Sequence, residues 1–136
     1  GTPIDLQQID TPSYCLATMN DHIVLWPAAY QSARGMSNLV DSKRVRFVLA
    51  GAGHVAGVIN HAATGKYPHW VNTTLPENHE QWFAGAEKMQ GSWWNDWYQW
   101  LLTYAGDRIP ARNPGSNGFP AGEDAPGRYV KKRLEA

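Results

Sequence analysis

Two short apolar runs on either side of a segment with helical periodicity constrain the fold of this chain most. Residues 13–19, SYCLATM, and residues 45–50, VRFVLA, are both bounded by turn residues, and each predicts a buried strand. Between them a helix is predicted from Pro27, with its apolar face formed by Ala29, Ala33, Met36 and Val40. Strand, helix and strand in so short a stretch predict a βαβ unit, whose two strands must run parallel.

Each predicted strand is followed by a residue that can carry chemistry. Asp21 follows the first strand and His54 follows the second. Parallel strands of one βαβ unit end at the same edge of the sheet, where open α/β sheets place their sites, so the two side chains are expected to be neighbours. A carboxylate that accepts from Nδ1–H would fix the imidazole tautomer and leave Nε2 free to take a proton from a nucleophile.

The glycines around His54 allow a second interpretation. The stretch GAGHVA fits the dinucleotide-binding spacing G-x-G-x-x-G/A. That motif needs a full helix, a further strand and an acidic residue about 20 positions on. Here Gly57, Gly65 and Pro68 interrupt, and the next acidic residue is Glu77. The match is therefore interpreted as fortuitous.

The rest of the chain is predicted to be helical and then irregular. PENHEQWFAGAEKM, residues 76–89, predicts one helix, and Ser92 is expected to cap a second that runs from Trp93 to about Ala105. The aromatic stripe of the second helix is expected to be a core face. Prolines and glycines recur from Arg108 and predict an extended arm. The predicted organisation is an α/β domain portion over residues 1–106 with an arm of the same domain over residues 107–136.

Composition excludes several classes of partner. Twelve basic and twelve acidic residues cancel, so no overall field gathers nucleic acid. No stretch has the length of a membrane span or the pattern of a signal peptide, and a single cysteine, Cys15, fits a reducing compartment, so a cytoplasmic location is expected.

Cys15 lies inside an apolar run and is expected to behave as a small hydrophobe. His61, His69 and His79 lack the spacing of zinc ligands, and no metal or cofactor is expected. His22 is expected to pack or to form hydrogen bonds.

Four blocks of the sequence, in order, resemble the C-terminal part of the class I polyhydroxyalkanoate synthases: DHIVLW, FVLAGAGHVAGVIN, GSWWNDWYQWL and APGRYVK. The resemblance implies the C-terminal portion of an α/β-hydrolase fold. It also implies that a cysteine attacks the thioester of a (R)-3-hydroxyacyl-CoA, that the growing polyester is carried as an acyl-cysteine, and that CoA leaves. The expected partners are this substrate, the polyester and the rest of the synthase, and the resemblance further implies a homodimer at the surface of polyester granules in the cytoplasm.

Within this resemblance, His54 matches the catalytic histidine and would be the general base that activates the cysteine. Asp21 matches the catalytic aspartate, which would either orient the histidine or help to activate the hydroxyl of the incoming unit. Ala56 resembles the short-chain class and favours 3-hydroxybutyryl-type substrates. The box G-x-C-x-G, which would carry the nucleophile, is absent from this sequence. We therefore expect a fragment that is inactive alone, with the nucleophile located upstream.

Two rival interpretations stay open at the level of the sequence. A serine or thioester hydrolase of the same fold would carry G-x-S-x-G in the missing part. A non-catalytic, granule-associated fragment would carry neither box and would use its aromatic helices as an interaction surface. The residues upstream of Gly1 would separate the three.

Overall fold

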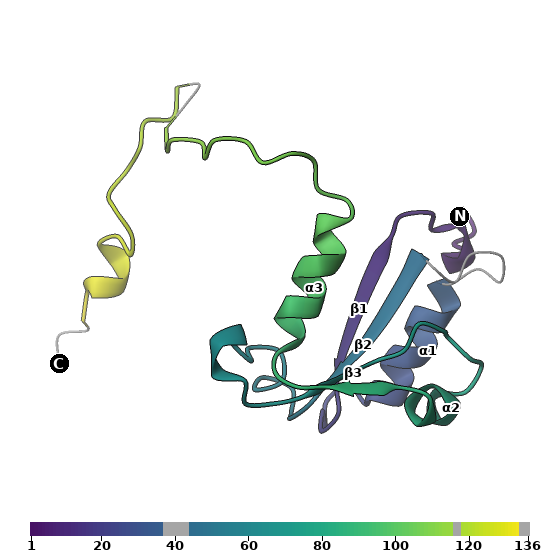
Figure 1. The fold of residues 1–136 in the computed structure, drawn as a ribbon. Helices are drawn as coiled ribbons and strands as arrows, with labels where there is room; N and C mark the ends of the chain where they lie inside the picture. Colours follow the sequence, from purple (N-terminus) through teal and green to yellow (C-terminus); the bar gives the residue numbers. More distant parts are fainter. Residues whose placement is uncertain (37–43, 116–117, 134–136) are drawn as a thin grey trace. The chain divides into compact units, whose positions relative to one another are not determined.

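The computed structural model describes residues 1–36, 44–115 and 118–133. The chain forms two compact units, residues 1–105 and residues 106–136, which are described separately (Figure 1). In the described part of the chain no helix combines the length and the apolar character that crossing a membrane requires.

The predicted βαβ unit opens the first unit. After a short 3₁₀ helix η1, Leu6–Gln8, the chain forms β1, Ser13–Thr18, then α1, Trp26–Met36, and then β2, Val45–Ala50. β1 and β2 pair in parallel along their whole length. The prediction of two parallel strands joined by a helix is therefore confirmed, while Val40 of the predicted helix face lies outside the described residues.

Two strands that the sequence did not predict complete the sheet. β3, His69–Val71, pairs antiparallel with β2, and β4, Glu87–Met89, pairs antiparallel with β3. The sheet is therefore mixed, with the strand order β1-β2-β3-β4. The structure also contains the 3₁₀ helix η3, over Ala62–Thr64.

The single helix predicted over residues 76–89 is wrong in its second half. The helix α2 spans only His79–Ala84; Asn78 caps its start, and Gly85 ends it. The three residues of β4 follow almost at once and pair with β3. Pairing with the sheet thus outweighs the helical pattern in this part of the chain.

The core lies between one face of the sheet and the helices α1 and α2. Trp82 of α2 is fully buried, and its ring lies 4.9 Å from Phe47 of β2 and 5.9 Å from Tyr30 of α1. The contact with Phe47 is edge-to-face and the contact with Tyr30 is tilted, and such aromatic contacts add to the stabilisation from burial. Val45 and Leu49 of β2 are buried in the same cluster.

The helix α3, Trp93–Leu102, packs on the other face of the sheet (Figure 1). Ser92 accepts the N–H of Trp94 and caps the helix as predicted, but the helix ends at Leu102 rather than near residue 105. None of its residues is buried. The expectation that its aromatic stripe forms a core face is therefore wrong for this chain, because no other layer covers the helix in the described unit.

Three side chains fasten α3 to the sheet. Tyr14 of β1 donates its hydroxyl to Asp96 of α3 over 2.8 Å, and Arg46 of β2 forms a two-point ion pair with the same carboxylate. Burial pushes the pKa of Asp96 upward, but the hydrogen bonds from Arg46 and Tyr14 outweigh burial and leave that pKa below its ordinary value. Asp96 therefore stays ionised and holds both strands.

The second unit is irregular, as its prolines and glycines predict. Helical structure among its described residues is confined to one 3₁₀ turn, η4, at Tyr129–Lys131. An exposed ion pair joins Arg128 to Glu123. The assignment of residues 107–136 to the same domain stays a prediction.

Candidate active site

Asp21 stands in the turn that follows β1. Its backbone N–H donates to the carbonyl of Thr18 over 3.2 Å. Its Oδ1 accepts the backbone N–H groups of Ile23 and Val24 over 2.9 and 3.0 Å. Side chains of aspartate commonly form such turns with the backbone that follows them. The carboxylate is thereby held in one orientation.

His54 stands in the turns that follow β2, residues 51–59. The N–H of Gly57 donates to the carbonyl of Gly53 over 2.8 Å, and the N–H of Ile59 donates to the carbonyl of Val55 over 3.0 Å. These are single turns and not the full helix that a dinucleotide site requires. The dinucleotide interpretation of GAGHVA therefore has no structural support.

The two loops are joined by their backbones. The N–H of Asn20 donates to the carbonyl of Ala52 over 3.0 Å. Ala52 has a φ of 68°, a left-handed conformation that is costly for a residue with a Cβ. Ala52 thus lies two positions before His54. Its carbonyl joins the turns at residues 51–59, the histidine loop, to the turn that contains Asn20 and Asp21, the aspartate loop.

The edge of the sheet brings the two predicted site residues together. The Nδ1 atom of His54 lies 2.7 Å from Oδ2 of Asp21. The hydrogen bond with His54, together with those from the backbone of Val24 and Ile23, lowers the pKa of Asp21 to about 2. An ionised carboxylate can only accept hydrogen bonds, so Nδ1 of His54 carries the proton and, in the neutral ring, Nε2 carries the lone pair.

The side chains of Asp21 and His54 differ in their exposure to solvent. The side chain of Asp21 is 9% exposed, whereas that of His54 is 46% exposed. No group among the described residues hydrogen-bonds Nε2 of His54. The carboxylate is thus shielded while much of the imidazole is accessible, an arrangement that a general base and an orienting acid can use.

A mostly apolar pocket of about 240 Å³ opens beside this pair. Its lining comprises Leu16, Ala17, Thr18, Asp21, Val24, Ala29, His54 and Val58. The lining contains no cysteine or serine, so no described residue of the pocket can serve as the expected nucleophile. Several apolar side chains around it are exposed, among them Ile23, Leu25, Val55 and Ile59.

Cys15 does not belong to this site. It lies inside β1, packs against the core cluster, and is partly buried. Burial raises the pKa of its thiol, which disfavours the thiolate that a nucleophile needs. The prediction that Cys15 is a small hydrophobe is confirmed.

The other described histidines form no hydrogen bond with the pair. His22 is exposed and forms no side-chain hydrogen bond with the other described residues, contrary to the expectation that it packs or forms hydrogen bonds. His61 accepts the N–H of Ala63, and His69 is buried against the carbonyl of Gly91. No cluster of three metal-ligating side chains occurs within residues 1–36, 44–115 and 118–133.

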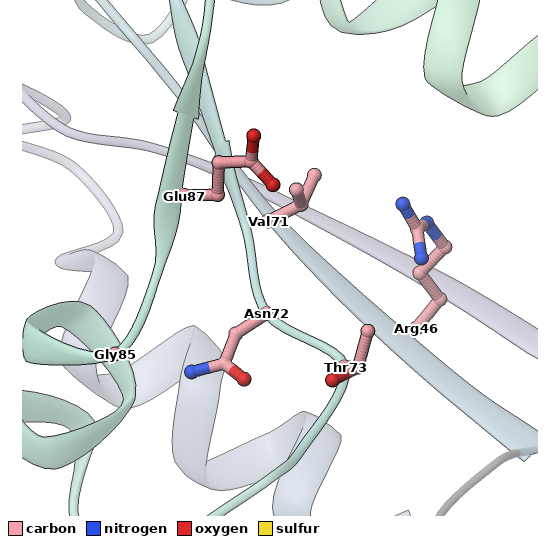
Figure 2. A pocket seen from close by; sticks show the side chains of 6 residues that line it. All are labelled: Arg46, Val71, Asn72, Thr73, Gly85 and Glu87. Atoms are coloured by element: carbon pink, nitrogen blue, oxygen red, sulfur yellow. The ribbon is translucent and has the colours of Figure 1, made fainter.

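A second, polar pocket of about 150 Å³ lies away from the two loops. Figure 2 shows its lining, with Arg46 from β2, Asn72 and Thr73 from the segment after β3, and Glu87 from β4. Arg46 is already paired with Asp96, and the side-chain amide of Asn72 donates to the carbonyl of Trp82. Because its main polar groups hold the fold together, we assign this pocket no site.

Sequence reasoning missed the groups that hold the histidine loop. Trp93 and Trp94 donate their indole N–H groups to the carbonyls of Gly57 and Val58, over 3.0 and 2.9 Å. In the sequence, the only indication of these hydrogen bonds is the pair of tryptophans that follows the cap residue Ser92, and the aromatic stripe to which they belong was expected to form a core face.

Comparison with known proteins gives the family. No family model matches the chain. The chain is 48% identical, over 98% of its length, to the "Poly(3-hydroxyalkanoate) polymerase subunit PhaC" of Cupriavidus necator. The chain belongs with the poly(3-hydroxyalkanoate) polymerases. It is also 37% identical over 98% of its length to the corresponding subunit of Rhizobium etli, and 37% identical over 98% to "Poly(3-hydroxyalkanoate) polymerase 2" of Ectopseudomonas oleovorans.

The resemblance of the sequence to the polyhydroxyalkanoate synthases is thus confirmed at the level of the family. The chain spans 22%, 20% and 23% of the length of these three polymerases, about a fifth of each. The aligned region includes β1, β2 and the two loops that follow them, because almost the whole chain is aligned.

Proposed function

We propose that this chain is the C-terminal portion of a polyhydroxyalkanoate polymerase, with an α/β-hydrolase-like fold, and that it supplies His54 and Asp21 to a cysteine-histidine-aspartate site. One observation carries the proposal: the Nδ1 atom of His54 lies 2.7 Å from a carboxylate oxygen of Asp21 at the carboxyl edge of two parallel strands. The identity to polymerases over 98% of the chain supports the choice of reaction.

In the proposed reaction, Nε2 of His54 takes the proton from a cysteine thiol that the rest of the polymerase supplies. The thiolate attacks the thioester carbon of a (R)-3-hydroxyacyl-CoA, and the bond from that carbon to the CoA sulfur breaks. The proton on His54 passes to the departing CoA thiolate, so the products are acyl-cysteine and CoA. The hydroxyl oxygen of the next hydroxyacyl-CoA then attacks the acyl-cysteine carbon, and the bond from that carbon to the cysteine sulfur breaks. The hydroxyl proton passes through His54 to the departing cysteine thiolate, so the polyester grows by one unit and the thiol is restored.

The two oxygens of Asp21 favour an orienting role over activation of the incoming hydroxyl. Oδ2 contacts His54, while Oδ1 already accepts the N–H groups of Ile23 and Val24. A carboxylate that is engaged at both oxygens and only 9% exposed is poorly placed to take a proton from a substrate. With a pKa near 2 it is also a weak base.

The finer parts of the proposal follow from the family. The substrate is 3-hydroxybutyryl-CoA, as Ala56 beside the histidine favours, and the whole polymerase acts as a homodimer at the surface of polyester granules in the cytoplasm. The chain is inactive alone because its pocket contains no nucleophile. A hydrolase could use the same base and acid, but the relatives that match this chain are polymerases.

Replacement of His54 by alanine in the whole polymerase tests the proposal. We expect CoA release from 3-hydroxybutyryl-CoA to fall by at least about 10³-fold, because the thiol loses its base. His22→Ala is the matched control, since this neighbouring histidine is exposed and lies outside the pair, and it should keep the wild-type rate. Near-normal CoA release by a folded His54→Ala enzyme would contradict the proposal.

A further inference from the structure

The turns that carry His54 are held from outside by the beginning of α3. Trp93 and Trp94 are consecutive residues in its first turn, and their indole N–H groups reach two consecutive carbonyls, those of Gly57 and Val58. The indole N–H can only donate, and these carbonyls lie three and four residues after His54. Two tryptophans of one helix end thus fix a short stretch directly behind the proposed base.

The helix end that holds the loop is itself fixed to the sheet. Asp96, in the same first turn, binds Tyr14 of β1 and Arg46 of β2. The ring of Tyr14 also lies 6.1 Å from that of Trp93. A displacement of the first turn of α3 would therefore break its contacts with both strands.

The histidine loop has little room to adjust on its inner side. A Cβ at Gly57 would lie 2.6 Å from Cγ2 of Thr18 and 2.5 Å from the carbonyl oxygen of Gly51. Thr18 ends β1, three residues before Asp21. The loop thus packs closely against the end of β1, the strand that leads to Asp21, and two of its carbonyls are also bound by the indoles.

We propose that Trp93 and Trp94 are positioning residues, whose indole N–H groups set the place of His54 relative to Asp21 and to the thiol that it activates. This inference rests on the proposed function of His54. The indoles touch neither the substrate nor the reacting atoms; they act through the carbonyls of the loop. Loss of a donor lets the loop move and lengthens the distance between the base and its thiol, which slows proton transfer without weakening the binding of substrate.

Replacement of each tryptophan by phenylalanine in the whole polymerase removes the N–H group and keeps an aromatic ring. Single-turnover release of CoA measures the rate constant per competent site, and the substrate dependence of that rate gives the apparent affinity. We expect Trp93→Phe and Trp94→Phe each to lower the rate constant on the order of tenfold, and the double variant to lower it further, with the apparent affinity unchanged. A role confined to stability would lower the thermal midpoint and leave the rate constant of the folded enzyme intact.

Trp97→Phe is the matched control, because Trp97 lies on the same helix, is 41% exposed and does not donate its indole N–H to any other described residue. It should keep the wild-type rate constant. Rates of Trp93→Phe and Trp94→Phe equal to that of Trp97→Phe would overturn the inference, while an inactive His54→Ala enzyme measured alongside would leave the proposed function standing. An active His54→Ala enzyme would instead overturn the proposed function. If the double variant does not fold, the two single variants decide by the same criteria.

Discussion

Replacement of Gly57 by alanine tests how closely the histidine loop packs on the sheet. The new Cβ would lie 2.5 Å from the carbonyl oxygen of Gly51, 2.6 Å from Cγ2 of Thr18 and 3.0 Å from the carbonyl oxygen of Gly53. Two of these three atoms belong to the backbone and cannot rotate away, so the loop itself must shift. Overpacking of this kind costs about 1–3 kcal/mol. A displacement of about 1 Å of a catalytic group can cost on the order of 10²-fold in rate.

The assay compares Gly57→Ala with Gly53→Ala in the whole polymerase. Gly53 lies in the same loop, directly before His54, but a Cβ there would meet only the carbonyl oxygen of Asn20, at an ordinary 3.5 Å. We expect Gly57→Ala to lower both the thermal midpoint and the rate of CoA release, and Gly53→Ala to change both much less. Wild-type stability and rate in Gly57→Ala would refute the close packing of this loop against Thr18.

Three further predictions concern the fold and its charges. Trp82→Ala should destabilise the first unit by about 3–5 kcal/mol, because a fully buried indole is removed from the core; chemical denaturation measures the loss. Asp96→Asn should destabilise it by about 1–3 kcal/mol, since the partly buried Arg46 loses its ion pair, and the same measurement checks this. Folding lowers the pKa values of both Asp21 and Asp96, so their contributions to stability are present above about pH 4, the ordinary carboxyl pKa, and are lost at lower pH. The contribution of Asp21 is lost as the pH falls through about 2. Thermal midpoints between about pH 5 and pH 2 should fall accordingly, and less steeply in Asp21→Asn.

Sequence patterns predicted the part of the fold that positions the candidate site. The apolar runs at residues 13–19 and 45–50 and the helical spacing between them predicted β1, α1 and β2, and a short βαβ connection permits only parallel strands. The meeting of Asp21 and His54 followed from this topology alone, before any distance was known. Their catalytic roles stay a prediction, because geometry does not measure proton transfer.

The parts that the sequence did not predict depend on partners distant in the chain. β3 and β4 are three residues long, too short for a period to show, and Glu87–Met89 is a strand because it pairs with His69–Val71. The aromatic stripe of α3 predicted a buried helix face. Whether that face is buried depends on which elements pack over the helix, and the helical spacing of the aromatic residues does not determine this. The indole donors escaped notice because their acceptors are backbone carbonyls, which carry no sequence signature.

Asp21→Asn most directly tests the central claim that Asp21 orients His54. The asparagine amide cannot reproduce the charge that holds Nδ1–H, so the imidazole is free to adopt the wrong tautomer. The measurement is the rate of the first CoA release, which reports acylation of the cysteine, compared with the rate of later releases, which report extension of the polyester. The account predicts that the first release itself slows by about 10²–10⁴-fold. A first release at the wild-type rate, with only the later releases slowed, would contradict it and would assign Asp21 to activation of the incoming hydroxyl.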